Sequence, residues 1–258
     1  DVIRTSKFQW TSDFNIGFNR NRVTELYGGK PELKGLKRLE EGRDMDEWYL
    51  REWAGVDPAN GSPLWYTTDE NGKRTTTDSY NKADRVYCGS AAPKFTGGWM
   101  NSFSYKGFTL TANFDFVYGN LLYNQSRELL DSDGAYADYN SMKLKSGWKR
   151  WEKEGDIATH PKAINGGNKN SNKSSSRYLE KGNYFSLRNL SLGYSIPEKL
   201  CGKLGLQRVN VSCSADNLFT LTPFSGVSPQ LSDSSTDGYA GTIYPLSRRI
   251  VFGLNVSF

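Results

Sequence analysis

The side chains that could perform acid–base or metal chemistry in this sequence are few and scattered. His160 is the only histidine, it precedes Pro161 in a long polar stretch, and no Gly-x-Ser-x-Gly nucleophile elbow is present. This position predicts a solvent-exposed loop histidine and not a catalytic base. Cys88, Cys201 and Cys213 are odd in number and irregularly spaced, which fits neither a disulfide framework nor a zinc site. The sequence therefore predicts no enzyme and no cofactor, and its histidine and cysteines predict no metal site.

Asp57, Asn60, Asp69 and Asn71 carry side-chain oxygens that could bind calcium. Their spacing is also explained by turns, because Asp and Asn side chains accept hydrogen bonds from their own backbone. The residues alone leave both interpretations open.

Aromatic residues in the long polar stretches are the best candidates for contact with a ligand or a covering protein. Aromatic faces stack on sugar rings and fill peptide-binding pockets. The alternative is that these side chains pack the loops against one another. The candidates are Trp48, Trp53, Trp65, Tyr66, Trp148 and Trp151.

The elements that must position these loops are strands of alternating polarity, most clearly at the carboxyl end. An apolar residue stands at every second position there, and only Val251 interrupts the small or polar residues between them. A strand with one apolar face at a free carboxyl end is typical of an outer-membrane β-barrel, where that face meets lipid. The alternating apolar residues are Ile250, Phe252, Leu254, Val256 and Phe258.

Five further segments alternate in the same way, each close to the roughly ten residues that a tilted strand needs to cross a bilayer. Phe185 and Leu187 lie in the opposite phase to Leu190 and Leu192, which a β-bulge would explain. The predicted strands lie near 4–20, 95–106, 108–120, 184–196, 207–217 and 247–258.

The polar residues that alternate with the apolar ones would face the interior of such a barrel. There they could line the lumen or contact a plug domain. These candidates are Asn15, Asn113, Asp115, Asn189, Asn210, Asp216 and Asn255.

Short and long connections alternate between the predicted strands. The short ones are 106–107 and 197–206, whereas 21–94, 121–183 and 218–246 are long, polar and rich in turn residues. Outer-membrane barrels have short periplasmic turns and long extracellular loops. The pattern therefore predicts three extracellular loops and a periplasmic carboxyl terminus at Phe258. The turn residues 58–61 predict a hairpin within the first loop.

The overall composition leaves two classes of protein open. Only 36% of the residues are hydrophobic, yet 14% are aromatic, and no stretch approaches the roughly 20 apolar residues of a membrane helix. A soluble secreted carbohydrate-binding β-sandwich would have the same composition, and it would fold without detergent. The net charge of +5 comes from interleaved charges, which predicts no nucleic-acid partner.

Several motifs, taken in order along the chain, resemble the SusC-like (RagA-like) TonB-dependent transporters of Bacteroidetes. Any single motif is short, but the series covers nearly the whole sequence. The motifs are EWAGVDP at 52–58 followed by Gly61 and PLWY at 63–66, PKFTGG at 93–98, YKGF at 105–108, RYL at 177–179, Tyr184 with LRNL at 187–190, GYSIP at 193–197, DNLFT at 216–220, SG at 225–226 and YP at 244–245.

This resemblance implies an all-β fold: antiparallel transmembrane strands forming the last part of a barrel of about 22 strands in the outer membrane. It implies import of large nutrients driven by the TonB complex, with glycans as the expected cargo and peptides as the alternative. A SusD-like lipoprotein would cover the outer mouth. The Bam machinery would recognise the terminal strand that ends at Phe258.

Residues 1–258 contain no counterpart of the family's plug domain, TonB box or amino-terminal extension. Six strands are fewer than the roughly eight that a membrane barrel needs to close, and a bilayer does not tolerate unpaired strand edges. The sequence therefore predicts the carboxy-terminal part of a larger receptor. Its partners would include the plug domain and the remaining barrel strands, one of which would pair with 247–258.

Overall fold

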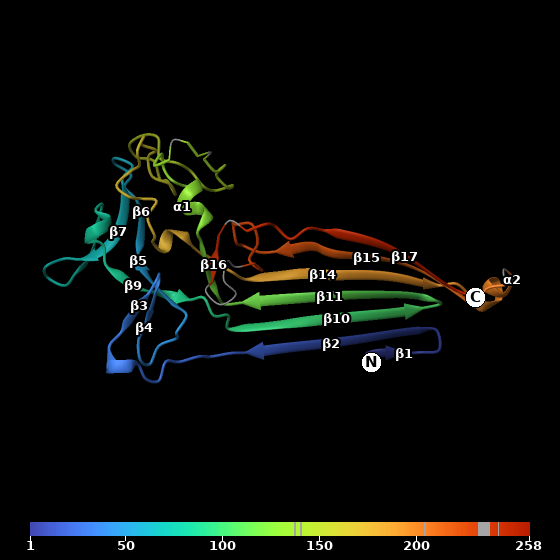
Figure 1. Ribbon diagram of the computed structural model, residues 1–258. Coiled ribbons are helices and arrows are strands. Elements are labelled where there is room, and N and C mark those ends of the chain that lie inside the picture. Colours follow the sequence, from blue (N-terminus) through green and yellow to red (C-terminus); the bar gives the residue numbers. More distant parts are fainter. Residues whose placement is uncertain (137, 140, 204, 232–237, 242) are drawn as a thin grey trace.

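The computed structural model describes residues 1–136, 138–139, 141–203, 205–231, 238–241 and 243–258. A long sheet occupies one half of the molecule, and the long connections gather at one end of it (Figure 1). These connections, 19–94, 119–183 and the described part of 222–248, are called the loop unit below. The predicted third loop, 218–246, includes 232–237 and 242, which lie outside the described residues. Among the described residues, no helix is long and apolar enough to cross a membrane.

The long sheet has seven strands in the order β1-β2-β10-β11-β14-β15-β17, and every pairing is antiparallel. This confirms the predicted all-β antiparallel fold. The sheet does not close on itself, because β1 and β17 each pair with one neighbour. The strands are β1 (Ile3–Arg4), β2 (Phe8–Phe18), β10 (Phe95–Tyr105), β11 (Phe108–Tyr118), β14 (Tyr184–Ser195), β15 (Arg208–Leu221) and β17 (Arg249–Ser257).

Two strand boundaries differ from the prediction. The strand expected near 4–20 is divided, because Thr5 Oγ1 accepts a hydrogen bond from the Phe8 N–H at 2.9 Å and turns the chain back. Ile3–Arg4 consequently pairs with β2 as a separate edge strand. The strand expected to end at 217 continues to Leu221, past Asn217 at φ 53°.

The predicted β-bulge in β14 is confirmed. Against β11 the register shifts between Leu187 and Asn189, which leaves Arg188 as the extra residue. The pairing with β15 shifts at the same place, where Asn217 and Leu218 lie opposite Arg188. The bulge explains why the apolar residues before Arg188 lie in the opposite phase to those after it.

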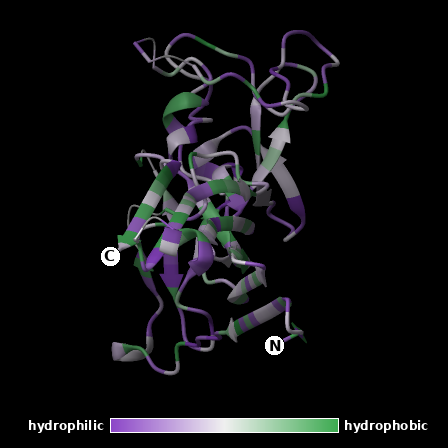
Figure 2. Ribbon diagram, turned by 90° about the vertical axis from the view of Figure 1, so that its right-hand side faces the viewer, coloured by the Kyte–Doolittle hydropathy of each residue, from purple (hydrophilic) through white to green (hydrophobic). Residues whose placement is uncertain are grey.

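The two faces of the sheet differ sharply in polarity. The register aligns Phe14, Trp99 and Phe114 in one row, whereas Asp13, Met100 and Asn113 form the next row on the opposite face. Hydrophilic and hydrophobic residues alternate along the strands (Figure 2). On the apolar face large side chains remain uncovered, among them Phe252, which is 80% exposed. These two faces are called the apolar face and the polar face.

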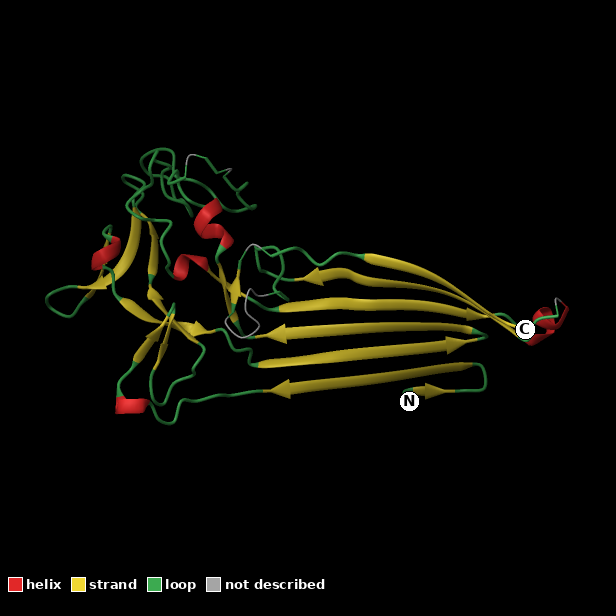
Figure 3. Ribbon diagram, in the orientation of Figure 1, coloured by secondary structure: helices red, strands yellow, loops and turns green. Residues whose placement is uncertain are grey.

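The loop unit contains three small sheets and most of the short helices (Figure 3). Pairing of β6 with β7 confirms the hairpin predicted in the first loop. The strands are β3 (Glu32–Lys34), β4 (Lys37–Leu39), β5 (Glu47–Arg51) and β9 (Arg85–Ser90) in one sheet; β6 (Trp53–Val56), β7 (Pro63–Thr68) and β8 (Arg74–Thr77) in the second; and β12 (Leu121–Asn124), β13 (Leu179–Lys181) and β16 (Tyr239–Ala240) in the third. The helices of the unit are η1 (Tyr27–Gly29), η2 (Tyr80–Lys82), α1 (Ser126–Leu130) and η3 (Ser176–Tyr178).

A buried aromatic cluster joins the first long connection to the second. Trp48 and Leu50 of β5 pack with Tyr123 of β12 and Tyr178 of η3. The Trp48 indole N–H also donates to the carbonyl of Leu121 at 3.0 Å. The two loops therefore share one core and are not independent excursions from the sheet.

The short connections lie at the opposite end of the sheet (Figure 1). Lys106 and Gly107 link β10 to β11 with φ 47° and 88°, the left-handed pair of a two-residue hairpin. Helix α2 (Glu198–Lys203) lies in the connection from β14 to β15.

Candidate functional site

The polar face of the long sheet carries the seven residues predicted to point inward. Asn15 and Asp115 both pair with Gly98, Asn113 and Asp216 both pair with Asn189, and Asn210 pairs with Asn255. Since side chains alternate along each strand, this register places all seven on one face.

Two charged clusters hold neighbouring strands together on the polar face. Arg188, the bulge residue, approaches Asp115 with Nε 3.7 Å from Oδ1, and the Tyr184 hydroxyl donates to Oδ2 of Asp115 at 3.1 Å. In the second cluster, Asp216 accepts hydrogen bonds from Asn189 and Arg249, each at 2.7 Å. The polar face is therefore a wall of paired charges that can contact a polar cargo or a second protein domain.

A cavity of about 450 Å³ lies where this wall meets the loop unit. Val117 and Tyr184 line it from the polar face, and Asn120 and Leu122 line it from the chain that continues β11 into the loop unit. Gly119, at φ 91°, makes that turn possible because glycine adopts positive φ without strain. This cavity is called the inner rim pocket. Its remaining lining residues are Asn19, Asp46, Ala91, Ala92, Pro93, Pro229, Gln230, Leu231 and Gly238.

The inner rim pocket contains a donor and an acceptor without partners. Asn120 Oδ1 and Gln230 Nε2 are buried, and neither forms a hydrogen bond with any residue that the structure describes. Leaving such a group unpaired costs about 1–3 kcal/mol. Both atoms therefore keep hydrogen-bonding capacity that the described residues do not use. Sequence patterning could not have identified this pair, because the two residues belong to different long connections.

Three of the six aromatic candidates are buried inside the loop unit, which corrects the expectation that they contact a ligand or lid. Trp48 and Trp65 are fully buried, and Trp151 is 8% exposed. The Trp151 indole N–H donates to the carbonyl of Pro58 at 3.0 Å, and Trp65 packs edge-on against Tyr80. These side chains hold the loop unit together.

The other three aromatic candidates are partly exposed, but each has a cation over its ring. Arg177 lies 5.0 Å from the ring of Trp53, and Arg74 lies 3.8 Å from that of Tyr66. Arg127 lies 4.4 Å from the ring of Trp148, so these contacts occupy part of each aromatic surface. None of the six aromatic residues lines the inner rim pocket.

His160 is 1% exposed, so the prediction of a solvent-exposed histidine is wrong. Its Nε2 lies 3.1 Å from Oδ2 of Asp131, and Arg127 Nε lies 2.7 Å from the same oxygen. Burial alone would raise the pKa of Asp131, but the hydrogen bond with His160 and the charge of Arg127 lower it below the ordinary value.

A second buried carboxylate, Asp133, binds Arg177 and lies 2.6 Å from Arg150. Together with Asp131, Arg127 and His160 it forms what is called the loop ion cluster. The i, i+4 spacing of Arg127 and Asp131 was the only local signal of it in the sequence. The carboxylates of this cluster pair with basic residues from separate parts of the second long connection, which indicates a structural role.

Turn formation accounts for the residues considered as calcium ligands. Asp57 Oδ1 accepts from the Ala59 N–H at 2.9 Å, and Asp69 Oδ1 accepts from the Asn71 and Lys73 N–H groups, also at 2.9 Å. Within the described ranges, no group of three or more His, Cys, Asp or Glu side chains is arranged to hold a metal ion.

Comparison with known proteins gives a consistent set of relatives. The chain is 28% identical to TonB-dependent receptor P39 of Formosa agariphila, over 99% of the chain and 29% of that protein. It is also 28% identical to TonB-dependent receptor P3 of the same organism, over 99% of the chain and 27% of that protein. No protein-family model matches the chain.

Among solved structures, the chain matches the RagAB peptide transporter with a TM-score of 0.83 and 26% identity, covering 99% of the chain and 28% of the solved chain. The match to the RagAB peptide importer in its open-open state has a TM-score of 0.81 and 25% identity, and covers 27% of that chain. The chain therefore corresponds to a carboxy-terminal part of these larger proteins and spans about three tenths of their length.

Proposed function

We propose, from the similarity to TonB-dependent receptors, that this chain forms part of the barrel wall and the extracellular loops of an outer-membrane importer of large nutrients. The observation that carries the proposal is the open, two-faced sheet. Its apolar face exposes large side chains such as Phe14 and Phe252 and would meet lipid, and its polar face carries paired charges and would line the lumen. A soluble sandwich would instead bury side chains such as Phe252.

The loop unit would lie outside the cell, and the short connections with Phe258 would lie in the periplasm. This orientation follows from the concentration of the long connections at one end of the sheet, since outer-membrane barrels have long extracellular loops and short periplasmic turns.

The work of this chain is positional and requires no catalytic residue. Asn15, Asn113, Asp115 and the other inward residues of the polar face would contact cargo or the plug domain. The free edge of β17 would pair with a strand from the rest of the receptor, because a bilayer does not tolerate an open edge. A SusD-like lipoprotein would cover the loop unit, the TonB complex would act through the plug-bearing part, and the Bam machinery would recognise β17.

Peptides are the first class of cargo to consider. Asn120 and Gln230 in the inner rim pocket offer one acceptor and one donor, which match the N–H and C=O of a peptide unit. The RagAB proteins, which share this fold, transport peptides. Glycans are the second candidate, because Trp53, Tyr66 and Trp148 keep part of their aromatic surface exposed.

The test is binding of short peptides and of oligosaccharides to the full-length receptor, with the double variant Asn120→Ala/Gln230→Ala. Loss of two hydrogen bonds should weaken binding of the true cargo about tenfold or more, since each contributes about 1 kcal/mol. Asn71→Ala, an exposed carboxamide outside the pocket, is the matched control and should bind normally. Unchanged binding by the double variant would refute the assignment of the pocket.

A further inference from the structure

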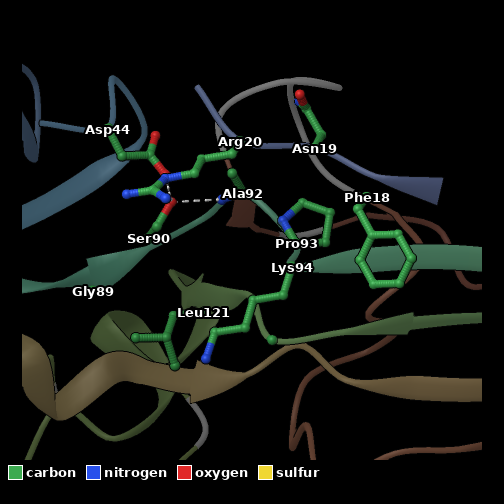
Figure 4. A pocket seen from close by; sticks show the side chains of 11 residues that line it. Phe18, Asn19, Arg20, Asp44, Gly89, Ser90, Ala92, Pro93, Lys94 and Leu121 are labelled. Atoms are coloured by element: carbon green, nitrogen blue, oxygen red, sulfur yellow. Dashed lines mark hydrogen bonds between the residues drawn. The ribbon is translucent and has the colours of Figure 1, made fainter. Parts of the chain in front are cut away.

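A second cavity, of about 610 Å³, lies at the same end of the sheet as the inner rim pocket. Asn19, Ala92 and Pro93 line both cavities, so the two cavities are adjacent. The second cavity is called the outer rim pocket and is lined by Phe18, Arg20, Lys94 and Leu121, among others (Figure 4).

The outer rim pocket adjoins the apolar face of the sheet at Phe18. Phe18, which is 73% exposed, pairs with Phe95, and Phe95 pairs with Tyr118. The rings of Phe18 and Phe95 are 5.9 Å apart, and those of Phe95 and Tyr118 are stacked at 5.0 Å. A row of aromatic side chains therefore leads from the apolar face into the pocket.

Two cations in the outer rim pocket have no counter-ion. Neither Arg20 nor Lys94 takes part in an ion pair among the described residues. The carboxylate of Asp44 also lines the pocket, but both of its oxygens accept hydrogen bonds, from the Ser90 hydroxyl and the Asp46 N–H, each at 2.8 Å. The lining is therefore net positive.

Backbone geometry fixes the start of the Lys94 side chain. The Lys94 N–H donates to the carbonyl of Tyr118 at 2.9 Å. The stem of Lys94 packs against Gly119, where a Cβ would stand 2.6 Å from Lys94 Cγ. Glycine at this position thus allows the lysine to lie close to the end of β11.

We propose that the outer rim pocket binds the phosphate head group of an outer-leaflet lipid, with its hydrocarbon chains along Phe18, Phe95 and Tyr118. This inference rests on the proposed function, which places the apolar face in the membrane. Arginine and lysine bind phosphate through charge-assisted hydrogen bonds, and basic clusters beside a membrane recognise lipid head groups. A free anion would use the two cations but would leave the aromatic row without an occupant.

The test measures lipid retention by the full-length receptor in phosphatidylcholine nanodiscs with added lipid A, read by native mass spectrometry. Arg20→Ala/Lys94→Ala should lower retention of lipid A about tenfold or more, because each basic residue near a membrane surface contributes about a factor of five. Arg20→Lys/Lys94→Arg keeps both charges and should retain the lipid. Lys30→Ala/Lys34→Ala removes two exposed loop cations outside the pocket and should also retain it.

Three results would overturn the inference. These are unchanged retention by Arg20→Ala/Lys94→Ala, equal loss in the Lys30→Ala/Lys34→Ala control, and equal retention of dephosphorylated lipid A. Displacement of lipid A by inorganic phosphate would show a site for free phosphate and would also contradict it. Membrane insertion and cargo uptake are measured in parallel to separate the two proposals. If the wild-type receptor neither inserts nor takes up cargo, the proposed function is refuted. If uptake is normal but lipid retention does not depend on Arg20 and Lys94, only the lipid site is refuted.

Discussion

At the scale of single residues, the loop unit is held by groups whose burial makes their partners indispensable. Trp48 fills the core shared by the first two long connections, and its indole N–H is satisfied by Leu121. Asp131 is fully buried, and among the described residues Arg127 and His160 lie at hydrogen-bond distance from its carboxylate. Without Asp131, Arg127 keeps its ion pair with Glu180 but loses one buried partner, and His160 loses the carboxylate that it faces. Loss of one partner of a buried pair costs more than the pair contributes when intact.

Asp131→Asn should destabilise the loop unit by about 3–5 kcal/mol, since it removes the charge that Arg127 and His160 face. Hydrogen exchange of the backbone around 127–133 and 158–161 in the full-length receptor measures the effect. Asp78→Asn, in an exposed pair with Lys169, should change stability by at most about 1 kcal/mol. Equal exchange rates in the two variants would contradict the structural role of the cluster.

Acidification should loosen the same cluster. The pKa of Asp131 is lowered in the folded protein, so its contribution to stability is fully present above the ordinary aspartate pKa of about 3.9. The contribution is lost as the pH falls through the lower folded value. Protection from hydrogen exchange should therefore fall below about pH 4 in the wild type. This loss of protection at low pH should be absent in Asp131→Asn. If the variant still loses protection there, another titrating group is responsible.

At the scale of elements, the long strands take their form from alternation and the connections take theirs from turn geometry. Arg188 shifts the register of β14, and this shift keeps apolar residues on one face along the whole strand. Lys106 and Gly107 close the β10–β11 hairpin in left-handed conformations. At Gly107 an added Cβ would stand 2.8 Å from the Ser195 carbonyl oxygen, so both backbone conformation and space require glycine there.

Gly107→Ala should slow or reduce assembly of the barrel, with a cost of about 1 kcal/mol or more from the positive φ alone. Gly202→Ala, in the other short connection, meets no atom within 4 Å and is the matched control. The measurement is the fraction of receptor in the outer membrane that resists unfolding in cold detergent. Assembly of Gly107→Ala at the level of Gly202→Ala would show that the turn tolerates a side chain.

At the scale of the whole molecule, the polarity of the two faces decides what can surround the sheet. The apolar face is uncovered within this chain, and the polar face carries clusters of charged and amide groups. The loop unit lies at one end only, so most of each face is free of contact with it.

Phe252 and Val251 are adjacent on β17 and point to opposite faces, so they offer a direct comparison. Phe252→Lys should destabilise the receptor by about 2–4 kcal/mol, the cost of a lysine at the lipid face near the middle of the bilayer. Val251→Lys should be tolerated, because it adds a charge to the polar face. The free energy of unfolding in lipid vesicles measures both. Similar losses in both variants would contradict a membrane environment on the apolar face.

Most of the long sheet could be predicted from the sequence, because alternation is a local property of each strand. The bulge at Arg188 was also visible as a change of phase. The turn at Thr5 could not be predicted, because the alternation begins at Phe8 and does not indicate where the preceding residues fold back.

The candidate site was much less predictable. The aromatic residues Trp48, Trp65 and Trp151 stood out in the sequence, but composition cannot distinguish an exposed ring from one in a loop core. Asn120 and Gln230 belong to different long connections. Arg20 and Lys94 lie at the two ends of a single connection. Each pair lines one pocket only because the antiparallel sheet brings these parts of the chain to the same end.

The alternation of polar and apolar residues was enough to predict the long strands and their two faces. The order of short and long connections was enough to predict the end of the sheet at which the long ones gather. Both patterns depend on residues that are close together in the sequence. The burial of His160, the loop ion cluster and the two rim pockets depend on contacts between residues far apart in the chain. Those contacts arise only when three separate connections pack on one another, and that packing is a property of the tertiary structure.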